Sequence, residues 1–455
     1  MLTKNIFIVG AKRTPFGAFG GLLKEVSATD LGVVSTKAAL TDSKVHPSLV
    51  DAVFFGNVIP SGTDSAYLAR HVALKSGMDL KTPAVTINRL CGSGFDTVCQ
   101  GANAIALNQA HIAVCGGTEN MSQAPLSVDG VTARWGAALG KGMKLEDMLW
   151  AGLTDAYAGT PMGITAENLA QRYNITREEC DQFAVRSQTL WKQAKDAGHF
   201  DLEIAPVEVE SKKKRTIMDV DEHPRPDTVY EKISKLKPVF TKDGTVTAAN
   251  ASGICDGAGT IILASEEAVK EHRLTPLARI VSYHVVGCDP KVMGIGPVPA
   301  IQSALQKAKL TLQDIDRIEI NEAFAAQFLA CAKELQLDMS KTNTSGGAIS
   351  LGHPLGASGS RITAHLANEF SRSNHVKYSI GAACIGTYIQ DDILFSSTKT
   401  IVLFGLVLIL ILPSNPHPPP LFFLLPNFFP YVTTSNIQNR WRTRNSNLPR
   451  TCLKT

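Results

Sequence analysis

NRLCGSGFDT, residues 88–97, lies where an apolar run ends and a helix-length segment begins. The run before it, PAVTI, contains β-branched residues typical of a buried strand. Two glycines follow the cysteine and allow a tight turn with close backbone approach. The segment 95–109 then has the length of a helix. The stretch therefore predicts a strand, a sharp turn and a helix, a unit typical of α/β folds.

A second glycine-rich corner, GGAISLGHPLGASGSR at residues 346–361, repeats this arrangement late in the chain. Around the two corners, apolar runs such as IFIVGA, AVFFGNV and IAVCGG alternate with helix-length segments. This alternation is typical of helices packed on sheets. We therefore predict an α/β protein that is internally duplicated, although the two corners resemble each other more in expected geometry than in sequence.

The sequence between residues 122 and 248 differs from both halves. It is polar and includes SVDGVTARWGAALGKGMKLEDM and SKKKRTIMDVDEHPRPD, which indicate loops and short helices. We interpret 122–248 as an insertion that covers a site. The N-terminal half is then expected at 1–121, completed by 249–271, and the C-terminal half at 272–392.

The last part of the chain, residues 393–455, is an apolar, proline-rich and basic tail. Its uninterrupted apolar core, Ile401–Leu412, has 12 residues, whereas a membrane-spanning helix needs about 20. The prolines that follow exclude regular helix and interior strand. We therefore predict no membrane span and a disordered or poorly packed tail.

Composition narrows the class of protein further. The chain has 455 residues, 44% of them hydrophobic, and a formal net charge of +4. Six lysines and arginines follow Asp392 without any acid, which leaves a net charge of −2 on the rest. No basic face therefore indicates nucleic-acid binding. Nine scattered cysteines without a CxxC pair indicate reduced thiols inside a cell and no zinc or other metal site.

Cys91 is the first candidate for chemistry. A free thiol has a pKa near 8.5, so only a few per cent is thiolate at neutral pH. A cysteine in the first turn of a helix meets unpaired N–H groups and the positive end of the helix dipole, which favour the anion. The position therefore predicts a nucleophile; the alternative is one more small buried residue.

Three other residues lie at comparable corners. His353 follows a glycine-rich turn, and an imidazole there can hold a proton from a thiol, or merely cap the loop. Cys384 ends the apolar strand SIGAACIG and is either reactive or part of the core. Asn321 stands at a strand-to-helix junction in INEAFAAQ, where it is either functional or a plain helix cap.

Seven segments in order resemble the thiolase family, and within it the mitochondrial type of 3-ketoacyl-CoA thiolases. The match runs from about residue 4 to residue 386. It implies two duplicated α/β halves in a layered αβαβα arrangement with a loop insertion, a homodimer or homotetramer, and no prosthetic group. The segments are NRLCGSGF, GGTENMSQAP, MGITAENLA, NASGICDGAG, NEAFAAQ, GGAISLGHPLGASGSRI and ACIG.

The resemblance implies a role for each matching catalytic residue. Cys91 is the nucleophile that takes the acyl group as a thioester, and His353 is its base. Cys384 is a second acid/base that protonates the leaving acetyl-CoA carbanion. Asn321 positions a water that forms an oxyanion hole with His353, and the N–H groups of Cys91 and Gly386 form a second hole.

The resemblance also implies how coenzyme A, the co-substrate, is held. Arg225, Thr228 and Ser252 match positions that contact coenzyme A. Met162 and Phe324 match positions that line the acyl and pantetheine path.

The implied reaction is thiolysis of 3-ketoacyl-CoA in fatty acid β-oxidation, in the mitochondrial matrix or alternatively in the cytoplasm or peroxisome. Acetoacetyl-CoA-specific relatives usually carry histidine where this chain has Pro161, which favours longer substrates. The alternatives are an acetoacetyl-CoA thiolase and an inactive thiolase-like scaffold. A decarboxylating ketoacyl synthase would need a second histidine where this chain has Cys384.

The resemblance stops abruptly after Gly386. Thr387 and Tyr388 replace glycines, and Asp391 and Asp392 fall where a last apolar strand is expected. We therefore expect that the later run IVLFGLVLIL replaces this strand, or that the C-terminal sheet is incomplete and activity is low.

Overall fold

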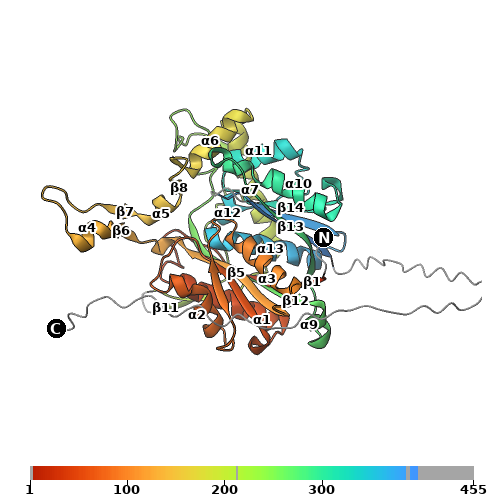
Figure 1. The fold of residues 1–455 in the computed structure, drawn as a ribbon. Coiled ribbons are helices and arrows are strands. Elements are labelled where there is room, and N and C mark those ends of the chain that lie inside the picture. The colour runs from red at the N-terminus through yellow and green to blue at the C-terminus, as the bar shows by residue number, and fades with distance from the viewer. Residues whose placement is uncertain (1–3, 212–213, 386–389, 398–455) are drawn as a thin grey trace, which may run out of the picture. The chain divides into compact units, whose positions relative to one another are not determined.

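The structure is a computed structural model that describes residues 4–211, 214–385 and 390–397 (Figure 1). These residues contain a ten-stranded sheet, in which the short β2 (Gly17–Ala18) pairs with one of the long strands. In spatial order the other strands are β14 (Arg317–Ile320), β15 (Tyr378–Ala383), β16 (Gln390–Ser397), β13 (Ala278–Val286), β1 (Ile6–Arg13), β12 (Cys255–Ser265), β5 (Ile112–Asn120), β3 (Ala52–Gly56) and β4 (Ala84–Ile87).

The pairing pattern occurs twice in this sheet. β3 and β5 are parallel, and β12 and β1 then add antiparallel. In the same way β14 and β15 are parallel, and β16 and β13 add antiparallel. Even β4, the parallel neighbour of β3, has a counterpart in the parallel bridge between Ile318 and Thr342. The predicted duplication of an α/β half is confirmed.

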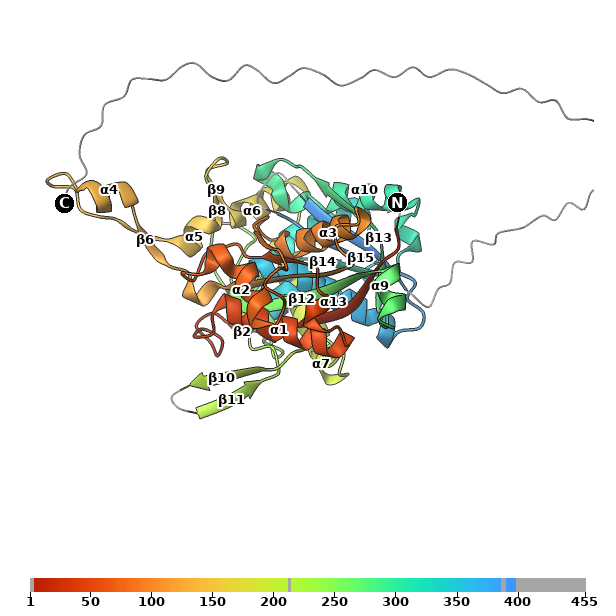
Figure 2. The same cartoon turned by 60° about the horizontal axis from the view of Figure 1, so that its bottom comes forward.

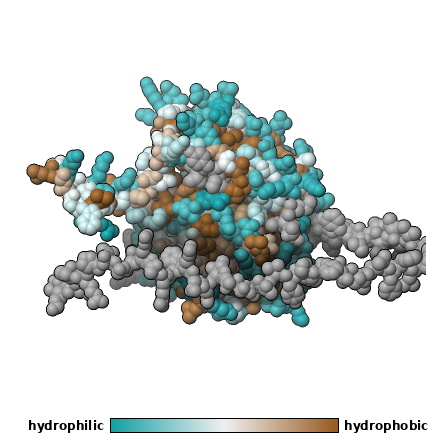
Figure 3. Space-filling view, in the orientation of Figure 1, coloured by the Kyte–Doolittle hydropathy of each residue, from teal (hydrophilic) through white to brown (hydrophobic). Residues whose placement is uncertain are grey.

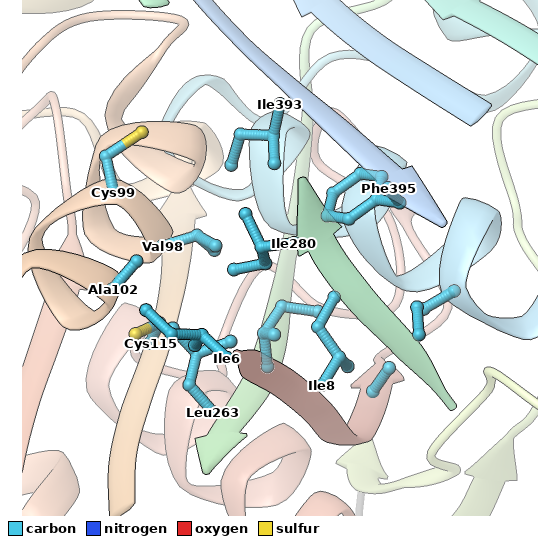
Figure 4. Close-up of a cluster of buried hydrophobic side chains, with 14 of the residues drawn as sticks. Ile6, Ile8, Val98, Cys99, Ala102, Cys115, Leu263, Ile280, Ile393 and Phe395 are labelled. Atoms are coloured by element: carbon cyan, nitrogen blue, oxygen red, sulfur yellow. The ribbon is translucent and has the colours of Figure 1, made fainter. Parts of the chain in front are cut away.

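Two helices, α3 (Ser93–Ala106) and α13 (Leu355–Arg372), form the layer between the halves (Figure 1). Their apolar faces share one core with side chains from both halves of the sheet, including Ile6, Leu263 and Phe395 (Figure 4). The central helices therefore join the two halves by burying apolar area on both sides.

Other helices cover the outer faces of the sheet. α1 (Ala28–Ser43) and α2 (Leu68–Lys75) pack on the N-terminal half, and α10 (Pro297–Ala308) and α11 (Ala325–Leu335) pack on the C-terminal half (Figure 2). Along β5 the side chains alternate between these layers, as the period of two in a strand requires. The result is the predicted αβαβα order of layers.

The last strand contradicts both expectations for the C-terminus. β16 pairs with β15 and β13 from Gln390 to Ser397, so the sheet is complete without the run IVLFGLVLIL. Asp391 and Asp392 are part of this strand, in register with Val285 and His284 of β13. Ile393 and Phe395, which follow them, are buried in the central core, and Leu394 is buried in the outer core of the C-terminal half.

Gly386 and the part of the tail beyond Ser397 lie outside the described residues. The strand itself extends past the boundary expected after residue 392. Among the described residues, no helix combines the length and the apolar character that crossing a membrane requires.

The insertion begins with an arm, β6 and β7 with α4 between them, that projects from the other elements (Figure 1). Large apolar side chains are exposed on this arm, among them Trp135 and Leu145, and brown patches mark it in Figure 3. The elements of the insertion are β6 (Leu126–Val128), α4 (Gly130–Trp135), β7 (Leu145–Asp147), α5 (Met148–Gly152), β8 (Thr154–Asp155), β9 (Thr160–Pro161), α6 (Met162–Arg172), α7 (Arg177–Asp196), β10 (Val207–Ser211), β11 (Lys214–Met218) and α8 (Tyr230–Ile233).

A buried ionic network fastens the insertion to β1. Arg13, with no exposed surface, donates from Nε to Glu203 (2.7 Å) and from Nη1 to Asp221 (2.6 Å). His365 of α13 lies 2.8 Å from the other oxygen of Glu203. The network therefore joins the insertion, the sheet and a central helix.

We expect Arg13→Met to destabilise the fold by about 3–5 kcal/mol, because it leaves Glu203 and Asp221 buried without their cation. Urea denaturation followed by circular dichroism measures the loss. The control Lys192→Met removes an exposed ion pair with Asp196 and should leave the denaturation midpoint unchanged. A loss below about 1 kcal/mol for Arg13→Met would show that water replaces the cation.

Candidate active site

Cys91 stands at the corner between β4 and α3. Arg89 and Cys91 form an isolated bridge, and Leu90 between them has a φ of 45°, which side-chain-bearing residues rarely adopt. Ser93 Oγ donates to Leu90 O (2.6 Å) and accepts from Arg89 N (2.8 Å). Gly92 is the N-cap of α3. The corner is therefore held rigidly, and the thiol lies just before the helix rather than in its first turn.

The environment of Cys91 does not favour a thiolate. The residue is half-buried, and burial raises the pKa of the thiol to about 12. A backbone N–H opposes this rise in pKa, and the nearby Glu119 carboxylate adds to it. The expected lowering of this pKa at the helix start was wrong, because desolvation outweighs it. The thiol is neutral and needs a base.

His353 is such a base. It lies between the short α12 (Ala348–Leu351) and α13, where its backbone N–H donates to Gly253 O (2.8 Å). Burial and then Arg361 lower the pKa of the imidazole to about 3, so the ring is neutral. A neutral ring accepts a proton where an imidazolium cannot.

The hydrogen bonds of His353 fix which ring nitrogen accepts. Ser358 Oγ lies 3.1 Å from Pro354 O and 2.5 Å from His353 Nδ1. Because the single hydroxyl hydrogen donates to the carbonyl, Ser358 must accept from Nδ1–H. The lone pair of His353 is therefore on Nε2, which lies 3.3 Å from Asn321 Nδ2.

Asn321 follows β14 and is buried, and its N–H donates to Ala382 O of β15 (2.9 Å). Its Oδ1 has no hydrogen-bond partner among the described residues. A buried oxygen of this kind costs free energy unless a ligand or water satisfies it. The amide is therefore suited to hold a polar ligand atom beside His353.

Cys384 is fully buried just after β15 and packs with Met293 and Ala323. Burial raises the pKa of its thiol far above the ordinary value, and a charge on Cys91 would raise it further. The two thiols therefore lie close enough that ionising one disfavours ionising the other.

A cavity of about 280 Å³ adjoins Cys91 and His353, whereas Asn321 and Cys384 are not among its lining residues. Cys91 and His353 line it together with three predicted binding residues, Met162, Ser252 and Phe324. Further lining side chains are mostly apolar, including Trp150, Leu153, Pro161, Val239, Phe240, Met293 and Leu355. The structure thus gathers residues from both halves and from the insertion around one apolar space.

A second, smaller cavity of about 50 Å³ adjoins the thiol. It shares Cys91, Leu153, Met162 and Leu355 with the larger cavity and extends to Thr154 and Asp155. Cys91 therefore has space on two sides.

Arg225 and Thr228 form one exposed turn, in which Thr228 Oγ1 donates to Arg225 O (2.6 Å), and neither lines the larger cavity. The turn approaches it through His223, whose ring packs against Gly253. Arg225 Nη1 donates to three nearby backbone carbonyls. Among the described residues no cluster of His, Cys, Asp or Glu is arranged to hold a metal ion.

One residue in the site, Glu119, is missed by the sequence analysis. It is buried near the end of β5, and its charge raises the pKa of the Cys91 thiol. The signal that identifies it is a carboxylate in the otherwise uncharged strand IAVCGGTEN, because a buried carboxylate needs specific partners.

Two protein-family models together match most of the chain. The family model described as "Thiolase, N-terminal domain" matches residues 6–267, and "Thiolase, C-terminal domain" matches residues 274–396. The second match includes most of β16.

Curated and solved relatives agree with this assignment. The chain is 59% identical over 385 residues, 85% of its length and 96% of the relative, to "3-ketoacyl-CoA thiolase, mitochondrial" of Homo sapiens. It is 47% identical over 383 residues, 84% of its length and 96% of the relative, to "Acetyl-CoA acetyltransferase" of Cupriavidus necator. A crystal structure of the human mitochondrial enzyme in complex with CoA superposes with a TM-score of 0.85 at 57% identity, covering 87% of this chain and 99% of that one. The chain belongs to the thiolase family.

Proposed function

We propose that this protein cleaves 3-ketoacyl-CoA with coenzyme A to give acetyl-CoA and a shortened acyl-CoA, as in fatty acid β-oxidation. One observation carries the proposal: a neutral imidazole, His353, and a neutral thiol, Cys91, line the same apolar cavity, with a second thiol, Cys384, buried close to the first. The high identity to proteins named 3-ketoacyl-CoA thiolase supports this reaction.

In the first half of the reaction, His353 Nε2 accepts the proton of Cys91, whose sulfur attacks the 3-keto carbon of the substrate. The bond between carbons 2 and 3 breaks, and its electron pair becomes the enolate of acetyl-CoA. Cys384 donates its proton to carbon 2. Acetyl-CoA leaves, and the remaining acyl group is a thioester on Cys91.

In the second half, the Cys384 thiolate takes the proton of an incoming coenzyme A thiol. The coenzyme A sulfur attacks the thioester, and Cys91 leaves as a thiolate that recovers its proton from His353. Both steps pass through an oxyanion. Asn321, through a water held with His353, and the N–H groups of Cys91 and Gly386 are the proposed donors. Each such donor is typically worth about 2.7–4 kcal/mol of barrier.

The residues that line the cavity support proposed contacts for the acyl and pantetheine parts of the substrate. Met162 and Phe324 line the proposed acyl and pantetheine path, and Ser252 lies on the same wall. Arg225 and Thr228 remain proposed contacts for the nucleotide end of coenzyme A, since their exposed turn adjoins the cavity wall at Gly253. We propose that 1–121 with 249–271, and 272–392, act as the two halves, and that the insertion 122–248 covers the site.

We further propose a homodimer or homotetramer in the mitochondrial matrix, with coenzyme A as co-substrate and no prosthetic group. The location rests on relatives named mitochondrial thiolases.

The apolar lining and Pro161 favour substrates longer than acetoacetyl-CoA. We expect kcat/KM for thiolysis to rise from the four-carbon substrate to medium-chain substrates in a series of 3-ketoacyl-CoA lengths. Leu153→Trp fills space between the two cavities and should lower kcat/KM for the longer substrates by about tenfold or more. The matched control Leu107→Trp changes an exposed leucine at the end of α3 and should have no effect.

Two results would change the proposal. The highest kcat/KM on the four-carbon substrate would indicate an acetoacetyl-CoA thiolase. Absence of thiolysis together with absence of an acetyl group on Cys91 after incubation with acetyl-CoA would indicate an inactive scaffold.

A further inference from the structure

Glu119 is a buried carboxylate that the proposed reaction does not use. It is the last residue but one of β5, has no exposed surface, and lies in a strand whose nine residues are all buried. Keeping a carboxylate at such depth costs several kcal/mol unless its oxygens are satisfied. Its partners therefore show what the residue does.

Four N–H groups from two distant segments converge on Glu119. Three belong to the loop after β3: Asn57 Nδ2 (3.0 Å), Val58 N (3.1 Å) and Ile59 N (2.9 Å). The fourth is Gly356 N (2.8 Å) in the first turn of α13. All four groups are hydrogen-bond donors, and an ionised carboxylate can accept from all of them. A protonated carboxyl carries an O–H of its own, which finds no acceptor among these donors.

These two segments carry opposite sides of the site. Val58 and Ile59 pack in the same apolar cluster as Cys91. Gly356 lies three residues after His353, at the start of the helix that this histidine precedes. One carboxylate therefore holds the wall beside the thiol and the loop of the base together.

The backbones around this connection are in direct contact. A Cβ at Gly117 would lie 1.8 Å from Gly356 O, and one at Gly94 would lie 3.0 Å from the same oxygen. β5, α3 and α13 thus meet without side chains between them. A shift of Gly356 therefore moves α13, and with it His353, relative to the thiol.

The charge of Glu119 also reaches Cys91. Burial raises the pKa of Glu119 to about 7, against the N–H donors that lower it, and Asp256 of β12 raises it further. The charge of Glu119 also raises the pKa of Cys255, the neighbour of Asp256. A negative Glu119 disfavours a negative Cys91.

We propose that Glu119 is the positioning residue of this site: it aligns the loop beside Cys91 with the helix after His353, and its charge keeps the thiol protonated until His353 takes the proton. The proposal rests on the function proposed above. A purely structural Glu119 would contribute to stability but would not link the reactivity of Cys91 to its own charge.

The test compares Glu119→Gln, Glu119→Asp and the control Asp256→Asn. Asp256 is a buried carboxylate on the neighbouring strand that binds Ser122 and not the two active-site segments. Each variant of the full chain is alkylated with iodoacetamide from about pH 5.5 to pH 9.5, and the rate at Cys91 is read by peptide mass spectrometry. The rate of Cys91 acetylation by acetyl-CoA is measured in parallel.

For Glu119→Gln we expect alkylation at Cys91 to match the wild type below about pH 6 and to be up to about tenfold faster above pH 8, where Glu119 is charged. Acetylation should slow about 10²-fold, because the amide cannot accept from all four donors and the loops lose alignment. Glu119→Asp keeps the charge but is one methylene shorter, so alkylation should follow the wild type while acetylation slows. Asp256→Asn should follow the wild type in acetylation and in alkylation above about pH 8. Because it removes a charge that raises the pKa of Glu119, its alkylation profile should differ only at lower pH, by a shift toward acid.

The proposal is overturned if Glu119→Gln shows the wild-type pH dependence of alkylation, or if its acetylation rate equals that of Asp256→Asn. Failure of the proposed function has a different signature. In that case the wild type itself gains no acetyl group, whereas alkylation by iodoacetamide needs only the thiol and still tests Glu119.

Discussion

Cys91→Ala is expected to lower kcat for thiolysis of 3-ketoacyl-CoA by about 10⁴- to 10⁶-fold, because it removes the atom that carries the acyl group. The residue is half-buried at a corner held by backbone and Ser93 contacts, so the variant should fold. The measurement is steady-state thiolysis at saturating substrate, together with the mass of the protein after exposure to acetyl-CoA.

The matched control is Cys99→Ala, which removes a thiol of α3, the helix that follows Cys91, from the central core rather than from the cavity. It should lose some stability and keep turnover. A Cys91→Ala protein that retains a tenth of wild-type kcat, or that still gains one acetyl group, would exclude a Cys91 acyl-enzyme.

Cys384→Ala is the second large effect. General acid/base groups typically contribute about 10²- to 10⁴-fold, so thiolysis should fall by that factor. Acetylation of Cys91 should fall much less than thiolysis, because the coenzyme A thiolate can leave without the proton of Cys384, whereas the carbanion at carbon 2 can neither form nor be protonated without this acid/base. Exchange of the acetyl-CoA methyl hydrogens with deuterated water, followed by NMR, should be lost for the same reason.

Cys331→Ala is the control for this substitution. Cys331 is a buried thiol that influences the pKa of Cys384 but belongs to the outer core of the C-terminal half, whereas Cys384 packs with Met293 and Ala323. It should retain methyl exchange. Equal loss of acetylation and exchange in Cys384→Ala would contradict a division of roles between the thiols and indicate instead a collapsed site.

Much of the fold could be predicted from the sequence because it depends on local patterns. The glycine corners around Cys91 and His353 mark two strand-to-helix turns, and the alternating apolar residues of β5 mark a strand covered on both faces. The last strand was wrongly predicted because two aspartates look incompatible with a buried strand, whereas its pairing with β15 and β13 depends on contacts that the local sequence does not show.

The site was less predictable because its properties depend on contacts between distant residues. The pKa of Cys91 rises through desolvation, which no local pattern shows, although the helix start suggested the opposite direction. Glu119 meets its partners across separations of 60 and 237 residues. The local sequence around a residue shows neither its burial in the fold nor its contacts with distant residues.

The position of β16 has a consequence for biosynthesis. The strand lies between β15 and β13, inside the sheet rather than at its edge, yet among the described strands it is the last to be translated. At about 5–20 residues per second, a ribosome needs about 20–90 s to finish a chain of this length. β13 precedes β16 by about 100 residues, so for roughly 5–20 s its unpaired backbone groups are open to any other nascent chain. Synthesis of β16, rather than local collapse, therefore sets the earliest moment at which this half can close, and chaperones that shield open sheet edges should bind the nascent chain until then.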